Sequence, residues 1–277
     1  MSNTIVESGD HIALVDEKQR CYIIDTTHKT DRFKGVGVFN PAELIGLTYG
    51  SRKIIGTKQF WLLPLSLPDA LQGLKRNAQI ILPKDAAQII VHCSITSGST
   101  VLEAGIGSGA LTTILAASVA PTGHIISYDI REEFINHAMN NLKQACLDNY
   151  VTPRIQDVTK NIFEKGLDAI ILDIPNPWDA IDHAWNALRI GGYICTYSPL
   201  ISQVEQSVKM IQSLPFIQIK TIELLEREMI VSAHGTRPSF HMLGHSGYLT
   251  FARKIGKDKE DEKKDNHYFL CSNVIPR

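Results

Sequence analysis

No stretch of this sequence is long and apolar enough to cross a membrane as a helix. Its apolar runs, such as Ala169–Leu172, fall far short of the roughly 20 residues that such a helix needs. The start of the chain, Met1–Asp10, is polar and acidic, and it lacks the basic and apolar segments of a signal peptide. We therefore expect no membrane association, and a protein that works in the cytoplasm.

Paired cysteines and a strong net charge are also lacking. The absence of any C-x-x-C pair favours reduced thiols over a disulfide framework or a metal site. Lys and Arg number 28 and Asp and Glu 29, a formal net charge of −1, so the composition provides no bulk attraction to nucleic acid. Residues 1–84 nevertheless carry 11 basic and 8 acidic residues (net +3), which is compatible with a polyanionic partner. The five scattered cysteines are Cys21, Cys93, Cys146, Cys195 and Cys271.

The composition is otherwise that of a globular protein with two textures. The chain has 277 residues, 44% of them hydrophobic, enough for one large domain or a main domain with a smaller partner. Short apolar runs separated by Asp, Gly, Asn and Pro predict a small antiparallel β domain over residues 1–75. Lys75–Pro83 is expected to be a connector and Lys84–Cys93 a short helix. The short apolar runs are His11–Val15, Cys21–Ile24, Gly35–Phe39, Lys53–Ile55 and Phe60–Leu63.

From residue 99 onward, strand-like runs alternate with helical patterns, which predicts a doubly wound α/β sheet within residues 76–255. Runs such as Ile170–Leu172 lack alternation, as expected of strands covered on both faces. A mixed charge run then predicts a solvated tail over residues 256–277. The expected strands are Thr100–Ala104, His124–Asp129, Pro153–Gln156, Leu167–Ile174, Tyr193–Ser198, Ile217–Leu225 and Tyr248–Lys254. The expected helices are Ala110–Val119, Arg131–Leu147, Trp178–Arg189 and Gln203–Leu214.

The first strand of this region runs into a glycine-rich segment, Glu103–Thr112 (EAGIGSGALT). Glycines let the backbone turn sharply and approach a ligand closely. The segment fits both the dinucleotide pattern G-x-G-x-x-A and the S-adenosylmethionine pattern (Asp/Glu)-x-G-x-G-x-G. Glu103 favours the second, because a carboxylate attracts a cationic sulfonium and ammonium group, whereas a pyrophosphate would gain nothing from it.

Three further carboxylates follow predicted strands. Asp129 lies 24 positions after Gly105 and suits a ribose diol. Asp157 could accept the amino hydrogens of an adenine or could cap a turn. Asp173 ends a central strand, where the side chain is expected to face the ligand crevice. Trp178, behind two prolines, could be a stacking face for a base or a lid on the following helix.

At this point the sequence resembles the tRNA (adenine-N1) methyltransferases that act on the T-loop. The similarity covers about residues 75–255, in order and at the family's spacing. It implies a class I, Rossmann-like methyltransferase domain with a seven-stranded sheet behind a small β domain. The matching segments are Gln79–Ile89, Glu103–Thr112, Ala120–Asp129, Leu172–Trp178, Arg237–Pro238 and His245–Ala252. Asp129 departs from the family's usual Glu and is one methylene shorter.

The resemblance implies S-adenosylmethionine as the methyl donor and N1 of adenine 58 of tRNA as the acceptor, with adenine 57 as a further acceptor in archaeal members. It also implies a tetramer, four copies of one chain in bacteria and archaea or two kinds of subunit in eukaryotes. We assign Asp173 as the catalytic residue, accepting a hydrogen bond from the adenine N6 amino group. The cofactor is assigned to Glu103, Gly105, Gly107, Ser108, Gly109, Ala110, Leu111, Asp129, Asp157, Val158 and Asp173, and the substrate to Gln79, Trp178, Arg237 and His245.

Alternatives remain at this point. In the predicted loop Ala233–Gly247, His241 and His245 form an H-x-x-x-H pair, but no third ligand is evident and no metal is expected. Arg237 and His245 could instead contact the tRNA backbone or another subunit, or His245 could be structural. Two other functions fit the same sheet, a methyltransferase of a protein carboxylate or small molecule and a non-catalytic tRNA-binding subunit. The intact glycine segment and Asp173 argue against the second.

Overall fold

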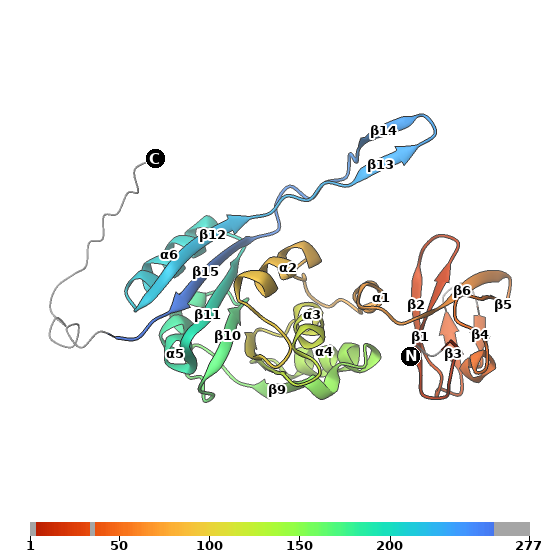
Figure 1. The fold of residues 1–277 in the computed structure, drawn as a ribbon, viewed down its shortest axis with the longest axis horizontal. Coiled ribbons are helices and arrows are strands. Elements are labelled where there is room, and N and C mark those ends of the chain that lie inside the picture. Colours follow the sequence, from red (N-terminus) through yellow and green to blue (C-terminus); the bar gives the residue numbers. More distant parts are fainter. Residues whose placement is uncertain (1–3, 34–36, 258–277) are drawn as a thin grey trace.

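The computed structural model describes residues 4–33 and 37–257, and a connector joins its two larger sheets (Figure 1). In the predicted tail only residues 256 and 257 lie within the described residues, and Cys271 lies outside them. In the described part of the chain, no helix has both the length and the apolar character that a membrane crossing requires. The division at residues 75 and 255 stays a prediction.

The N-terminal region forms an antiparallel sheet of four strands in the order β2-β1-β6-β5. Alternating apolar residues such as Ile12, Leu14 and Phe60 point into its own small core, as the period-two pattern predicts. A two-stranded ribbon and a 3-10 helix, η1, complete the region. The strands are β1 (His11–Asp16), β2 (Cys21–Asp25), β3 (Asp31–Phe33), β4 (Gly37–Phe39), β5 (Arg52–Ile55) and β6 (Lys58–Pro64), and η1 is Pro41–Leu44.

The second sheet has seven strands in the order β12-β15-β11-β10-β7-β8-β9, and only β15 runs antiparallel to its neighbours. This confirms the predicted doubly wound sheet. The carboxyl ends of its parallel strands share one edge, at which ligands bind in such sheets. The strands are β7 (Thr100–Ala104), β8 (His124–Asp129), β9 (Val151–Ile155), β10 (Leu167–Leu172), β11 (Leu188–Ser198), β12 (Phe216–Glu223) and β15 (Tyr248–Lys254).

Helices cover both faces of this sheet, and each face has its own apolar cluster. One cluster includes Ile89, Leu115 and Leu142 from α2, α3 and α4, and the other includes Ile181 and Ile211 from α5 and α6. The helices are α1 (Leu67–Gly73), α2 (Pro83–His92), α3 (Ala110–Val119), α4 (Glu132–Gln144), α5 (Ile181–Ala187) and α6 (Ile201–Gln212), with 3-10 turns η2 (Asp148–Tyr150) and η3 (Pro177–Ala180).

Between β12 and β15 the chain leaves the body as an arm, which we define as residues 225–247. The arm contains the hairpin of β13 (Met229–Ser232) and β14 (Gly235–Pro238), and every residue of these strands is exposed. Figure 1 shows the hairpin projecting well beyond the sheet, on the side towards which the N-terminal sheet also lies. The sequence predicted a loop over Ala233–Gly247, whereas the structure has strand β14 there, paired with β13. Helix α1 was not predicted either.

Candidate active site

The glycine segment forms the turn between β7 and α3, and its glycines meet three different geometric demands. A Cβ on Gly105 would lie 3.0 Å from Oδ2 of Asp129, so a side chain there would strike a carboxylate. Gly109, directly before α3, has a φ of +79°, and its Cβ would lie 3.1 Å from Cβ of Ala138. Gly107 has a φ of +53° with no atom within 4 Å of its Cβ position, so the turn leaves open space above it.

Glu103 lies almost completely buried on β7, with 1% of its surface exposed. Its Oε2 accepts hydrogen bonds from the hydroxyls of Thr112 (2.6 Å) and Ser127 (2.9 Å). Burial raises the pKa of Glu103 to about 8, against the lowering effect of these two hydrogen bonds. Among the described residues, no group donates to Oε1. A cation that binds beside Oε1 would therefore favour the ionised form of the buried Glu103 carboxyl.

Asp129, at the end of β8, is fixed by the residue that opens the next helix. Its Oδ1 accepts from the backbone N–H of Arg131 at 3.0 Å and from Nε of that arginine at 3.1 Å. The guanidinium in turn stacks on the Phe134 ring, 3.7 Å from its centroid. The carboxylate is 5% exposed and faces Gly105. It is therefore a rigid acceptor directly beside the glycine turn.

Asp173 is the third carboxylate at this edge, immediately after β10. The backbone joins it to the glycine turn, because Gly105 N donates to Asp173 O at 3.1 Å. The residue keeps some accessible surface, yet removal from water raises the pKa of its carboxyl to about 7. Glu103, Asp129 and Asp173 thus gather around Gly105, and the pKa of Glu103 responds to both other acids. Strand order and register bring these three predicted residues together.

The remaining cofactor candidates occupy more ordinary positions. Asp157 caps the turn after β9, accepting from the backbone and hydroxyl of Thr159 at 3.0 and 2.6 Å, and the hydrogen bond from that hydroxyl leads the causes that lower its pKa. Val158 is buried in the apolar cluster of α5 and α6. The Ser108 hydroxyl accepts from the backbone N–H groups of Asn77 and Ala78, both at 3.1 Å. The side chains of Asp157 and Ser108 therefore hold nearby backbone segments in place. Ala110 and Leu111 form the buried first turn of α3.

The four substrate candidates are not brought into one cluster. Gln79 is exposed on the connector, one residue after the contact with Ser108. Trp178 packs partly buried against the cluster that contains Ile181. Arg237 is exposed on the hairpin, with its guanidinium 4.1 Å from the centroid of the Phe240 ring. Gln79 follows Ala78, whose backbone N–H contacts Ser108 in the glycine turn, and Trp178 lies five positions after Asp173.

His245 lies at the root of the arm with both ring nitrogens engaged. Nδ1 is 2.6 Å from Oε1 of Glu223, and Nε2 is 2.8 Å from the carbonyl oxygen of Pro199. Both partners are acceptors, so the pair of bonds requires a protonated ring, and the bond to Glu223 is the leading cause of its raised pKa. Within the described residues no group of His, Cys, Asp and Glu is arranged to hold a metal ion.

The structure contains a buried polar network beside the site that was not predicted from the sequence. Lys84 Nζ donates to Oδ1 of Asp85 (2.8 Å), to the Leu224 carbonyl oxygen (2.9 Å) and to the Ser246 hydroxyl (2.7 Å). Ser246 donates to Asp85 Oδ2, while the Tyr197 hydroxyl donates to the Ser246 carbonyl oxygen. The network joins α2 to both ends of the arm. Its members lie up to 162 positions apart, so no local pattern could have revealed it.

Comparison with known proteins identifies the family to which a chain with this site belongs. The family described as "tRNA methyltransferase complex GCD14 subunit" matches residues 70–235, which include β7 to β12 and all three clustered carboxylates. This chain belongs to that family. The resemblance inferred from the sequence is thereby confirmed.

Individual members of the tRNA methyltransferase family and solved structures agree with the assignment. The chain is 40% identical to a protein of Methanocaldococcus jannaschii named tRNA (adenine(57)-N(1)/adenine(58)-N(1))-methyltransferase TrmI, over 74% of this chain and 83% of that protein. A Thermotoga maritima structure described as a SAM-dependent O-methyltransferase superposes with a TM-score of 0.81 at 31% identity, covering 92% of this chain and 97% of that one. The tRNA (m1A58) methyltransferase TrmI of Aquifex aeolicus gives 0.73 at 25% identity, covering 91% and 100%.

Proposed function

We propose that this chain transfers the methyl group of S-adenosylmethionine to N1 of adenine 58 in the tRNA T-loop, with adenine 57 as a further acceptor. The observation that carries the proposal is the placement of Asp173 beside Gly105, at the carboxyl edge of the sheet. The name of the Methanocaldococcus relative, which includes both positions, supports the choice of acceptor. Family membership supports the reaction class.

The residues at the glycine turn fit the proposed cofactor. When bound, S-adenosylmethionine supplies an electrophilic methyl group on a positively charged sulfur. The open space above Gly107 leaves room for a ligand against the backbone, and Glu103 offers an unpaired carboxylate oxygen to a cation. Asp129 holds an acceptor in place for hydroxyl groups such as those of a ribose. Three acids around one glycine would repel a pyrophosphate, so the set fits a cationic cofactor better than a dinucleotide.

Asp173 would act on the acceptor base. Adenine N1 is neutral and has a lone pair, so the chain need not remove a proton to create the nucleophile. Placement of N1 in line with the methyl group accounts for much of the rate that an enzyme can provide here. The ionised Asp173 carboxylate would accept a hydrogen bond from the N6 amino group, which favours electron density at N1 and stabilises the positive charge that develops on the methylated base. The base must leave its stack to reach this position.

A methyltransferase with a small oxygen acceptor is the second candidate, favoured by the description of the Thermotoga structure as an O-methyltransferase. Attack by a hydroxyl oxygen would need a base to take its proton. Asp173, with a pKa of about 7, could also serve that purpose. Methyl transfer to tRNA and methyl transfer to a small hydroxyl compound therefore distinguish the two candidates.

We further propose that the chain self-associates, as the resemblance implies, with a homotetramer as the specific expectation. The arm exposes several large apolar side chains, and an exposed apolar patch of this kind marks an interaction surface. They include Leu225 (63% exposed), Val231 (76%) and Phe240 (81%). Light scattering on the purified full chain would give the assembly directly. A location in the cytoplasm stays a prediction.

Methyl transfer to defined RNA tests the function. The full chain is incubated with labelled S-adenosylmethionine and a tRNA transcript, and with matched transcripts carrying guanine at position 58, at position 57 or at both. Nucleoside mass spectrometry should find 1-methyladenosine, and the amount should fall when position 58 is changed. Labelling that is unaffected by these changes, or that appears only with proteins or small hydroxyl compounds, contradicts the proposal.

A further inference from the structure

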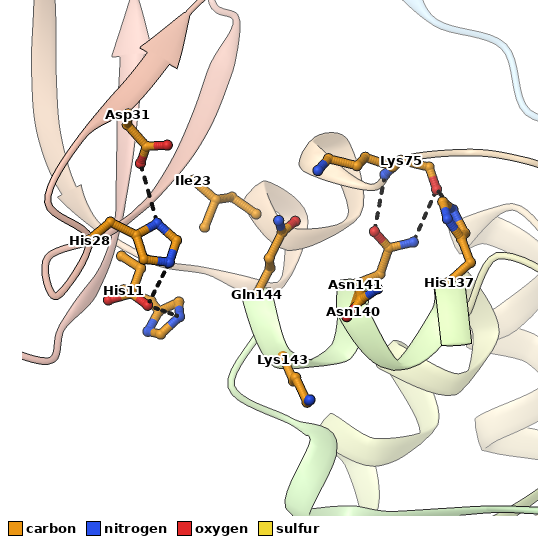
Figure 2. Close-up of a pocket in the computed structure, with 11 residues that line it drawn as sticks. His11, Ile23, His28, Asp31, Lys75, His137, Asn140, Asn141, Lys143 and Gln144 are labelled. Carbon is orange, nitrogen blue, oxygen red and sulfur yellow. Dashed lines mark hydrogen bonds and ion pairs between the residues drawn. The ribbon is translucent and has the colours of Figure 1, made fainter. Parts of the chain in front are cut away.

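A cavity of about 530 Å³ lies between the N-terminal sheet and helix α4, apart from the glycine turn and Asp173 (Figure 2). Its volume falls within the range of small-ligand sites and is large enough for one nucleotide. Residues of β1, of β2, of the following turn and of β3 form one wall, while the connector and the last turns of α4 form the other. Ile23 adds an apolar surface between them.

The α4 wall offers unused hydrogen-bond donors. The ammonium groups of Lys75 and Lys143 and the amides of Asn140 and Gln144 line the cavity, and in the described part of the chain none of these four groups makes a hydrogen bond or an ion pair. Figure 2 shows Gln144 and Lys143 at the end of α4 nearest the N-terminal sheet, with their side chains on opposite sides of the helix. This wall carries two positive charges and no acid, so it suits a phosphate group.

The opposite wall is composed of acceptors and imidazoles. Asp25 is occupied, since its Oδ1 accepts from the backbone and hydroxyl of Thr27 at 2.8 and 2.6 Å. Asp31 is less engaged, with His28 Nδ1 at 3.8 Å from its Oδ2. Partial burial raises the pKa of Asp31, while His28 and Lys75 oppose the shift. His11 and His28 also face Asp25, at 3.8 and 3.4 Å.

The two walls together favour a ligand that accepts hydrogen bonds at one end and donates them at the other. Two lysines against two aspartates leave the cavity without a net attraction for a bare polyanion, and a phosphate near Asp31 would be repelled. A nucleotide satisfies both walls, because its phosphate accepts hydrogen bonds while its base donates them from an amino group. Ile23 and the His28 ring supply surfaces on which the flat face of a base can pack.

We propose that this interdomain cavity binds a single unstacked nucleotide of the RNA substrate, with its phosphate towards Lys143 and an amino-bearing base towards Asp31. The inference rests on the proposed function, since it takes the substrate to be tRNA. The nucleotide is distinct from the base that is methylated, because the cavity does not include Asp173.

The location suits an RNA that also reaches the glycine turn. Asn141, on the cavity wall, donates to the Lys75 carbonyl oxygen (3.0 Å) and to the Ser108 carbonyl oxygen (2.9 Å). His137 Nε2 holds the same carbonyl oxygen of Lys75 at 2.5 Å. One backbone segment of the connector therefore separates the two sites, with the cavity on one side and the glycine turn on the other. A single folded RNA can therefore contact both the cavity and the glycine turn.

A matched pair of charge reversals tests the phosphate half. Lys143→Glu changes the basic residue in the last turn of α4, and Lys209→Glu changes the basic residue in the last turn of α6, which is also exposed and outside the cavity. With the full chain and full-length tRNA, Lys143→Glu should raise KM about tenfold and reduce the salt dependence of binding, with kcat and cofactor affinity unchanged. Equal behaviour of the two variants overturns the proposal.

The direction in which a second substitution changes the affinity for tRNA tests the proposed contact between Asp31 and the base. If the cavity were only an electrostatic surface, Asp31→Ala would remove a repulsive charge and tighten tRNA binding. If Asp31 accepts from a base, the same change should weaken binding severalfold. Circular dichroism and cofactor affinity report whether the variant is folded. Tighter or unchanged tRNA binding by a folded Asp31→Ala chain overturns the proposal.

These outcomes remain separate from failure of the proposed function. If the unaltered chain does not methylate tRNA, the function itself fails before any variant is compared. If it methylates tRNA and all three variants have the same KM as the unaltered chain, the function stands and only the cavity assignment falls.

Discussion

The carboxylate edge of the large sheet and the surfaces around it differ in how far their polar groups are already paired. Glu103 and Asp129 are almost fully buried and held by Thr112, Ser127 and Arg131. Among the described residues, the Lys143 ammonium at the cavity wall instead has no hydrogen-bond partner, and every residue of the hairpin strands β13 and β14 is exposed. We infer that the donor half, the part of the site proposed to hold the cofactor at Glu103 and Asp129, is organised before the cofactor binds. The acceptor half, the surfaces proposed to contact the RNA, would be completed by that partner.

The largest effect should separate the two halves. Replacement Asp173→Asn keeps the shape of the side chain but removes its charge, so turnover should fall by about 10²–10⁴-fold. The cofactor contacts proposed for Glu103 and Asp129 are untouched, and calorimetry should give a cofactor affinity within about twofold of the unaltered chain. A large loss of cofactor affinity together with turnover would show that the halves are not separable.

The Lys84 network should show how strongly the arm is tied to the body. Lys84→Met leaves Asp85 buried without its cation, and the free energy of unfolding should fall by about 3–5 kcal/mol. Denaturant unfolding would measure the loss. The double change Lys84→Met, Asp85→Leu is the control, because it removes the stranded charge and should recover much of the stability. If the single variant were as stable as its parent, the network would not be the anchor described above.

Asp173 should also carry a cost in stability that depends on pH. Its pKa is about 7 in the folded chain and near the ordinary value of 3.8 when unfolded, so the folded state binds the proton more tightly. Stability that is present below pH 3.8 is therefore lost as the pH rises through 7. We expect Asp173→Asn to raise the free energy of unfolding by about 1–3 kcal/mol at pH 8 relative to its effect at pH 4. The same gain at both pH values would argue against a raised pKa.

A smaller effect concerns Glu103 and the cofactor. With a pKa of about 8, the carboxyl is mostly protonated at pH 7 in the free protein, and a cationic ligand should drive off the proton. Cofactor affinity should then rise by up to about tenfold per pH unit below pH 8. Calorimetry in two buffers of different ionisation enthalpy would detect the released proton. Glu103→Gln should abolish both signals, and their persistence in that variant would exclude Glu103 as their source.

Much of the part of the site around the glycine turn could be predicted from the sequence, because its residues lie close together in sequence or on neighbouring strands. The apolar runs gave all seven strands of the large sheet, and the spacing placed Asp129 and Asp173 at one edge. Ser127 was missed, although it lies opposite Glu103 in the register of β7 and β8. Helix α1 was missed despite its capping pair, Ser66 and Asp69.

Other features depend on contacts that no local pattern contains. Strand β11 begins at Leu188, five residues before its predicted start, and it runs through Gly191, whose φ is +78°. The predicted helix Trp178–Arg189 accordingly divides into η3 and the short α5. The hairpin of the arm has no core beneath it, so its exposed residues lack the alternation by which strands are recognised.

The most direct test of the central claim is the rate of a single methyl transfer measured against pH. With cofactor already bound in excess and tRNA added, the rate should rise about tenfold per pH unit and level off near pH 7, as the Asp173 carboxyl ionises. In Asp173→Asn the low remaining rate should not vary with pH. A rate in the unaltered chain that is constant from pH 5.5 to 8.5, or that shows the same rise in Asp173→Asn, would contradict the account.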